Sequence, residues 1–353
     1  MKEGMGPAFS GSFNGPLHAK TYEDGLSSQA NPESLDKSGI GILVASLYAN
    51  PFFVRSLRDS IRSQIRLAQD FVGNHANWMI AKNPTQARQA IHMGKHVLIL
   101  SLEGASGILE TEEDLKEFID TDGISIVTLL HLTDDEYGGV ALLKGGKVFS
   151  DPWAWFKSLF SPNRVDGIKT NLNGLTSEGR NFTENLMARK VWIDLSHASD
   201  ATQRELVPML RMNGLPLLYT HTVLRKYHSA ERAITESQIN EVKRSGGLIG
   251  LVPSEEMLDG TPDLPGCDTP LGQLVVQYKE IAQTLNPAQI NFGSDFNGAL
   301  NHLRPGCGLS EGLWNISQVP ALWDALKKLG APIPEPRSLM VDTFLSTWSR
   351  IRD

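Results

Sequence analysis

The chain has 353 residues, of which 41% are hydrophobic and 21% are charged, an ordinary globular composition that can bury a sizeable core. The formal net charge of −7 argues against nucleic acid or an anionic membrane surface as the main partner, because those surfaces repel an acidic protein. A small molecule or a peptide is a better match as substrate.

Neither a basic segment followed by an apolar run nor a stretch of about 18 uncharged apolar residues occurs, which predicts a cytoplasmic protein with no membrane partner. A chain trimmed at its start would conceal a signal. The two cysteines, Cys267 and Cys307, lie in Gly- and Pro-rich sequence. Because a protein of this size needs no disulfide framework, we expect free thiols, with a bridge as the less favoured alternative.

Strand and helix patterns alternate after a Gly-, Ser- and Pro-rich start over residues 1–38, which predicts mostly loop. Buried strands are expected at residues 39–48, 96–102, 124–130, 190–196, 216–220, 248–252 and 289–293. Helices are expected at residues 53–72, 85–93, 112–120, 177–188, 200–212, 235–245, 271–285, 319–329 and 339–350. Such alternation is typical of a parallel sheet with right-handed crossovers. With an eighth strand, short or irregular, near Phe9–Phe13, it predicts a single α/β domain over residues 1–353, a TIM (β/α)8 barrel.

Two segments depart from this alternation. Residues 134–174 form a long insertion after the C-terminal end of a strand and should overhang the barrel mouth. Its aromatic residues, Trp153 and Trp155 among them, could form a lid or one wall of the substrate site. The alternatives are that the insertion packs only against itself or forms a dimer contact. Residues 301–353 are expected to form a C-terminal helical extension.

Five titratable residues stand at or just after five different predicted strand ends: Glu103, His131, His197, His221 and Asp295. In a parallel barrel these ends converge on one face, so the five side chains favour a metallohydrolase site over separate structural roles. Glu103, His197 and His221 are the candidate ligands of a catalytic zinc, which leaves one position for water. Asp295 is placed to move protons between the attacking water and the leaving amine, and His131 to stabilise the oxyanion.

Six short motifs follow one another between Gly39 and Gly298: Leu102–Gly104, Thr128–His131, Ile193–His197, Thr220–His221, Glu231–Arg232 and Phe292–Gly298. Together with residues 174–179 they resemble the motifs of the membrane (renal) dipeptidase family, peptidase family M19. The resemblance implies a TIM-barrel zinc dipeptidase, active on a dipeptide or similar small amide, with a homodimer as a possible assembly.

The resemblance also implies residue roles. Glu103 would bridge two zinc ions, and His197 and His221 would hold the second. His131 would polarise the substrate carbonyl and Asp295 would shuttle the proton. Arg232 would bind the free carboxylate of the substrate, a role that suits a planar bidentate donor.

The chain departs from the family where the first strand should end in a His-x-Asp pair, because no such pair precedes residue 100. The best counterpart, Phe13–His18, places Pro16 at the histidine position and His18 at the aspartate position. Leu132 and Ala233 also replace asparagines that are usual in the family. Three outcomes stay open: two zinc ions with His18 as a ligand, one zinc ion, or a degenerate barrel that binds a ligand or partner without hydrolysis. A hydrolase of some other small amide or ester is a further alternative.

Overall fold

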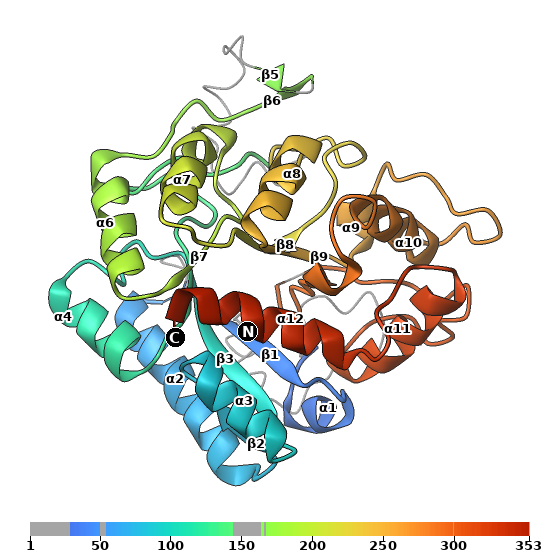
Figure 1. The fold of residues 1–353 in the computed structure, drawn as a ribbon, viewed down its shortest axis with the longest axis horizontal. Helices are drawn as coiled ribbons and strands as arrows, with labels where there is room; N and C mark the ends of the chain where they lie inside the picture. Colours follow the sequence, from blue (N-terminus) through green and yellow to red (C-terminus); the bar gives the residue numbers. More distant parts are fainter. Residues whose placement is uncertain (1–28, 50–53, 144–163, 166, 299, 353) are drawn as a thin grey trace.

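The computed structural model describes residues 29–49, 54–143, 164–165, 167–298 and 300–352. Its main sheet consists of parallel strands with helices packed outside it (Figure 1). The strands are β1 (Ile42–Leu47), β2 (Trp78–Ile80), β3 (His96–Glu103), β4 (Ile126–Thr128), β7 (Trp192–Asp194), β8 (Leu218–Thr222), β9 (Leu248–Leu251) and β10 (Ile290–Phe292). They pair in the order β1-β3-β4-β7-β8-β9-β10, and within the described residues β1 and β10 are not paired with each other. The sheet is therefore an α/β half-barrel, as the alternating pattern predicts.

The helices of the structure include counterparts of all nine predicted helices, close to their expected positions, and two short α-helices that were not predicted, α1 (Pro32–Lys37) and α9 (Glu255–Leu258). The counterparts are α2 (Leu57–Asn74), α3 (Pro84–His92), α4 (Glu112–Asp114) with a π-helical continuation (Leu115–Thr121), α6 (Ser177–Ala188), α7 (Asp200–Met212), α8 (Glu236–Ser245), α10 (Pro270–Ile281), α11 (Val319–Lys328) and α12 (Ser338–Arg352). Local capping explains several of the starts; for example, α7 begins after Ser199, whose side chain accepts a hydrogen bond from Thr202 N. A short antiparallel pair, β5 (Arg164–Val165) and β6 (Ile168–Lys169), lies outside the main sheet.

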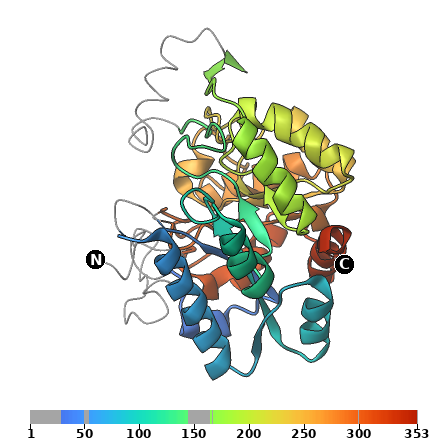
Figure 2. The ribbon, with the colours of Figure 1, turned by 90° about the vertical axis from the view of Figure 1, so that its left-hand side faces the viewer.

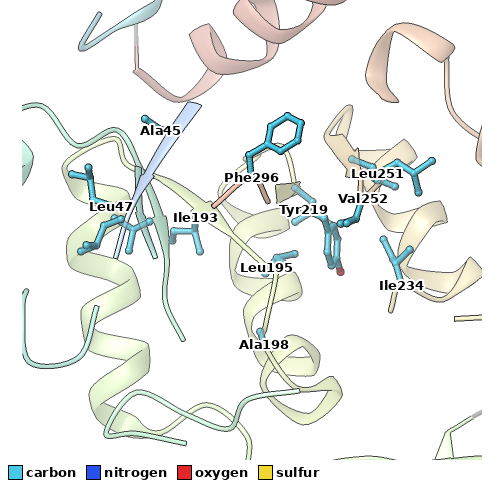
Figure 3. Packing of buried hydrophobic residues seen from close by; sticks show 14 of the residues in the cluster. Ala45, Leu47, Ile193, Leu195, Ala198, Tyr219, Ile234, Leu251, Val252 and Phe296 are labelled. Carbon is cyan, nitrogen blue, oxygen red and sulfur yellow. The ribbon is translucent and has the colours of Figure 1, made fainter. Parts of the chain in front are cut away.

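Two apolar layers lie on opposite sides of the strands, because successive strand residues point to opposite faces. The outer layer packs against the surrounding helices, and Figure 3 shows part of it, including Leu47 and Ile193. The inner layer contains Trp192, Leu218 and Leu248, each at the start of its strand, together with Leu345, Trp348 and Ile351 of α12. Helix α12 therefore closes the N-terminal end of the half-barrel, in front of the strands in Figure 1, and leaves the C-terminal end for the site.

The structure contains elements that the sequence did not predict. Helix α1 and strand β2 lie in sequence where neither was predicted; β2 is only three residues long, so it carries too few residues for a pattern, and it pairs with the first half of β3. The predicted strand near Phe9–Phe13 lies outside the described residues.

The expectation of free thiols was wrong, because Cys267 and Cys307 form a disulfide with Cα atoms 5.7 Å apart. Cys267 precedes α10 and Cys307 follows β10, and since β9 and β10 pair in the sheet, the loops that follow them meet. A large core indicates that the fold does not need a disulfide for stability. It does not predict whether the loops that carry the two cysteines lie side by side.

None of the helices in the described part of the chain is both long and apolar enough to cross a membrane. Residues 144–163 of the predicted insertion lie outside the described residues, so its position over the barrel mouth stays a prediction. The extents assigned to the single domain and to the C-terminal extension stay predictions as well. Figure 2 shows the half-barrel from the side, with the C-terminus at one edge.

Candidate metal centre

Three side chains from β3, β7 and β8, of which only β7 and β8 are adjacent, meet at the C-terminal end of the half-barrel. Glu103 ends β3, His197 follows β7 and His221 lies in β8. Glu103 Oε1 lies 3.1 Å from His197 Nε2 and 3.3 Å from His221 Nε2, and the two Nε2 atoms are 2.9 Å apart. Among the described residues these three form the group that could hold a metal ion. The structure therefore brings together three of the four candidate ligands that the sequence predicts.

The spacing of these atoms matches the requirement of a small divalent cation. Ligand atoms about 2.0–2.1 Å from a tetrahedral ion lie roughly 3.3 Å from one another, close to the three separations in this cluster. Two imidazole nitrogens and one carboxylate oxygen are also a donor set that suits zinc. The residues present thus fit a metal centre with one position left open.

A buried hydrogen-bond network orients the ring of His221. Thr220 Oγ1 donates to Asp194 Oδ2 at 2.6 Å and lies 2.8 Å from His221 Nδ1. Because the single hydroxyl proton goes to the carboxylate, the hydroxyl oxygen accepts from Nδ1–H. That assignment leaves the lone pair of Nε2 free to face Glu103 and His197. The arrangement is the carboxylate-supported histidine that metal sites commonly use.

His197 and Asp295 both adopt left-handed backbone conformations, with φ values of 67° and 52°. Residues with a Cβ rarely occupy this region, and where they do, the surrounding structure must hold them there. For His197 the loop residue Ala141 helps to do so, because its N–H donates to His197 O at 2.6 Å. These turns direct the two side chains into the site, and no feature of the sequence predicted them.

His131 lies at the edge of the cluster. Its Nε2 atom is 3.7 Å from Glu103 Oε1, and its ring packs edge-on against Tyr48 and His197, with centroids 4.4 and 4.6 Å apart. His131 Nδ1 is buried and makes no hydrogen bond with the described residues. Tyr48, one residue past β1, was not singled out in the sequence, where an aromatic residue after a strand carries no distinctive signal.

Arg232 and Asp295 complete one cavity with the metal-binding cluster. The cavity has a volume of about 1160 Å³, and its lining includes Glu103, His131, His197, His221, Arg232 and Asp295. Arg232 is 6% exposed, yet its guanidinium forms no hydrogen bond or ion pair with the residues that the structure describes. The negative charges of Asp194, Glu103 and Asp295 act on Arg232, but none of these carboxylates pairs with it directly, so its donors remain available to an anionic group. His18, the remaining predicted ligand, lies outside the described residues.

Burial and neighbouring groups set the charge states of the ligands. Burial would raise the pKa of Glu103, but the surrounding imidazoles, His131 first, outweigh it and hold that pKa well below its ordinary value. Burial, aided by the charge of Arg232, lowers the pKa of His197 far below its ordinary value, and burial also lowers the pKa of His131. A carboxylate beside neutral imidazoles is the state that metal ligation requires.

Two groups have pKa values shifted upward. Burial and the charge of Arg232 act to lower the pKa of His221, but a hydrogen bond from the protonated ring to Glu103 and the negative charges of Glu103 and Asp295 together outweigh them. A cation bound there would displace a proton from His221. Burial raises the pKa of Asp295, and His221 and Arg232 oppose that shift only in part. Asp295 can therefore take up a proton more readily than an exposed aspartate.

The loop that carries Asp295 rests on His302, which is fully buried. His302 Nε2 lies 2.6 Å from Ser294 O, and Nδ1 lies 3.0 Å from Gln29 Nε2, so the neutral ring donates to the carbonyl and accepts from the amide. Burial lowers the pKa of His302 to about 4, although the Ser294 and Leu300 carbonyls and the charge of Glu256 favour the protonated ring.

This histidine should make the protein sensitive to acid. The unfolded chain takes up a proton near pH 6.5 and the folded chain only near pH 4, so the stabilisation present above pH 6.5 is lost as the pH falls between those values, by about 3 kcal/mol. We expect His302→Gln, which keeps a donor and an acceptor, to flatten the fall in unfolding free energy between pH 7 and 5 measured by urea denaturation. His92→Gln, at an exposed position of α3, is the control. An unchanged slope in His302→Gln would assign the acid sensitivity to other groups.

The family model for membrane dipeptidase (peptidase family M19) matches residues 9–353. Dipeptidase ataJ of Aspergillus terreus is 22% identical over 254 residues, which are 70% of this chain and 58% of that protein. Dipeptidase 3 of Macaca fascicularis is 25% identical over 175 residues, 50% of this chain and 32% of that protein. This chain thus spans between about a third and three fifths of the length of these curated relatives.

Solved structures share the fold. A Rhodobacter sphaeroides metallopeptidase, liganded with a phosphinate mimic of the dipeptide L-Ala-D-Ala, has a TM-score of 0.69 at 16% identity and covers 92% of this chain and 90% of its own. The probable dipeptidase PvdM of Pseudomonas aeruginosa gives 0.69 at 16% identity, covering 92% of this chain and 89% of its own. The half-barrel is therefore a TIM-like barrel fold, as predicted. Since the family model covers nearly the whole chain, the protein belongs to the membrane dipeptidase family, peptidase family M19.

Proposed function

We propose that the protein is a zinc-dependent dipeptidase-like hydrolase that cleaves the amide bond of a dipeptide or a similar small amide. The observation that carries this proposal is the convergence of Glu103 Oε1 with the Nε2 atoms of His197 and His221 within 3.3 Å. These residues would hold one zinc ion. Membership of a metallopeptidase family supports a metal at this place, and the nitrogen and oxygen donors support zinc.

The groups around the cluster support amide hydrolysis. A zinc ion bound there would supply Lewis acidity towards the amide and would lower the pKa of a water molecule. Arg232 would hold the carboxylate of the substrate and so direct the amide towards the cluster. Asp295, with its raised pKa, would accept a proton and pass it to the leaving amine. His131 would donate a hydrogen bond to the oxygen on which negative charge develops.

Elemental analysis of the purified protein combined with a dipeptide panel tests the proposal. The panel begins with L-Ala-D-Ala, because the Rhodobacter structure holds a mimic of that dipeptide. We expect zinc in the protein and turnover that a chelator abolishes and added zinc restores. One zinc per chain would match the described cluster, and two would require further ligands such as His18. Absence of turnover in the zinc-loaded protein on every dipeptide and small amide would refute the proposal.

Arg232→Ala tests recognition of the free carboxylate. A hydrogen-bonded charge pair stabilises binding by about 1.5–3 kcal/mol, so we expect KM for L-Ala-D-Ala to rise roughly 10- to 100-fold while kcat changes little. Turnover of L-Ala-D-alaninamide, which lacks the carboxylate, should be the same in both proteins. An equal loss of turnover on the two substrates would show that Arg232 does not bind the carboxylate. The cytoplasmic location and the homodimer stay predictions.

A further inference from the structure

A second buried arginine, Arg225, binds the backbone on both sides of Arg232. Arg225 Nη2 donates to Glu231 O at 2.7 Å, and Arg225 Nε donates to Ala233 O at 2.9 Å. The Arg225 side chain is only 2% exposed. The two carbonyl groups that flank Arg232 are therefore attached to one rigid planar guanidinium.

Asp200, the first residue of α7, anchors Arg225 in turn. Arg225 Nη1 and Nη2 donate to Asp200 Oδ2 and Oδ1 at 2.7 and 2.8 Å, a bidentate ion pair. The N–H of Asp200 donates to Glu231 Oε1 at 2.8 Å, which closes a ring through Arg225, Asp200 and Glu231. Lysine could not make this set of contacts, because it has one nitrogen and no fixed fork of donors.

Arg232 depends on this ring for its direction. Its guanidinium makes no hydrogen bond or ion pair with the described residues, so the direction of the side chain is set mainly by its backbone. The same segment is tied to Leu142, since Arg232 N donates to Leu142 O at 3.3 Å and Leu142 N donates to Glu231 Oε2 at 2.9 Å. Arg225 is absent from the residues that line the cavity, so its effect on a substrate bound there is indirect.

We propose that Arg225, anchored by Asp200, is a positioning residue that sets the direction of the Arg232 guanidinium and thereby the affinity for the free carboxylate of the substrate. The inference rests on the proposed function, in which Arg232 binds that carboxylate. A bidentate contact between a guanidinium and a carboxylate requires both planes to be aligned, so a small rotation of the Arg232 backbone would weaken it.

Arg225→Lys tests the inference, because it keeps a positive charge beside Asp200 and loses the contacts that bridge Glu231 and Ala233. We expect KM for L-Ala-D-Ala, or for the fastest dipeptide of the panel above, to rise about tenfold with kcat within about twofold. In the Arg232→Ala background the same substitution should leave KM unchanged, since no guanidinium then remains to be aimed. Arg180→Gln, which breaks the exposed pair with Glu205, is the matched control and should leave both constants unchanged.

The outcomes separate this inference from the proposed function. If Arg232→Ala leaves KM unchanged, carboxylate recognition by Arg232 fails and the inference fails with it. If Arg232→Ala raises KM but Arg225→Lys does not, only the inference is overturned. A rise of equal size in both backgrounds would show a general structural role for Arg225 and would also overturn it. If Arg225→Lys folds poorly, Asp200→Asn replaces it as the test, because it removes the anchor but leaves Arg225 in place. We expect Asp200→Asn to raise KM in the otherwise unchanged protein and to leave KM unchanged in the Arg232→Ala background.

Discussion

Glu103→Gln should abolish hydrolysis and metal binding together. The substitution preserves the shape of the side chain but removes the negative charge that faces His197 Nε2 and His221 Nε2. A ligated ion contributes several kcal/mol to the transition state, so we expect kcat/KM to fall about 10³-fold or more. Zinc content measured by elemental analysis should fall in parallel. Glu184→Gln, at an exposed position of α6, should change neither quantity. Full activity in a Glu103→Gln protein without zinc would contradict the assignment of the metal centre.

Thr220→Val provides a graded version of the same test, because it removes the hydroxyl between Asp194 and His221 without removing a ligand. Loss of such a supporting hydrogen bond typically weakens metal binding about 10- to 100-fold. We expect that loss in a competition titration with a chelator, and recovery in Thr220→Ser, which keeps the hydroxyl. Equal affinities in the valine and serine variants would mean that the hydroxyl does not orient His221.

Asp295→Asn should reduce kcat while the metal stays bound. The amide cannot take up a proton from the site, and removing a positioned general base or acid typically lowers the rate about 10²- to 10⁴-fold. We expect KM and zinc content to change little, since Asp295 is not part of the group that could hold the metal. Parallel measurements of kcat, KM and zinc content test this.

Loss of zinc together with activity in Asp295→Asn would identify Asp295 as a ligand instead of a proton carrier. A fall in kcat of less than about tenfold would show that another group moves the proton. These results separate the two roles because Glu103→Gln is expected to lose metal and Asp295→Asn is not.

The positions of the candidate ligands were predictable because they follow from the chain connectivity of a parallel barrel. One predicted strand is directly followed by Glu103 and another by His197. Because all strands of a parallel barrel run in the same direction, both residues are expected at its C-terminal end. This prediction required neither the order of the strands in the sheet nor the distances between the side chains. The same logic failed for β2, because three residues are too few to carry a periodic pattern.

The sequence alone determined the fold class, the face on which the site lies and the residues that gather there, since periodicity and chain order are local properties. Only the tertiary structure decided which groups orient them: the left-handed turn at His197, the Thr220 hydroxyl shared by Asp194 and His221, and the Arg225 contacts on either side of Arg232. The Cys267–Cys307 disulfide is likewise a feature that only the tertiary structure decided. Each of these features depends on atoms from separate segments of the chain that lie within hydrogen-bond or covalent distance of one another. The spacing of residues along a single strand or helix does not predict such contacts.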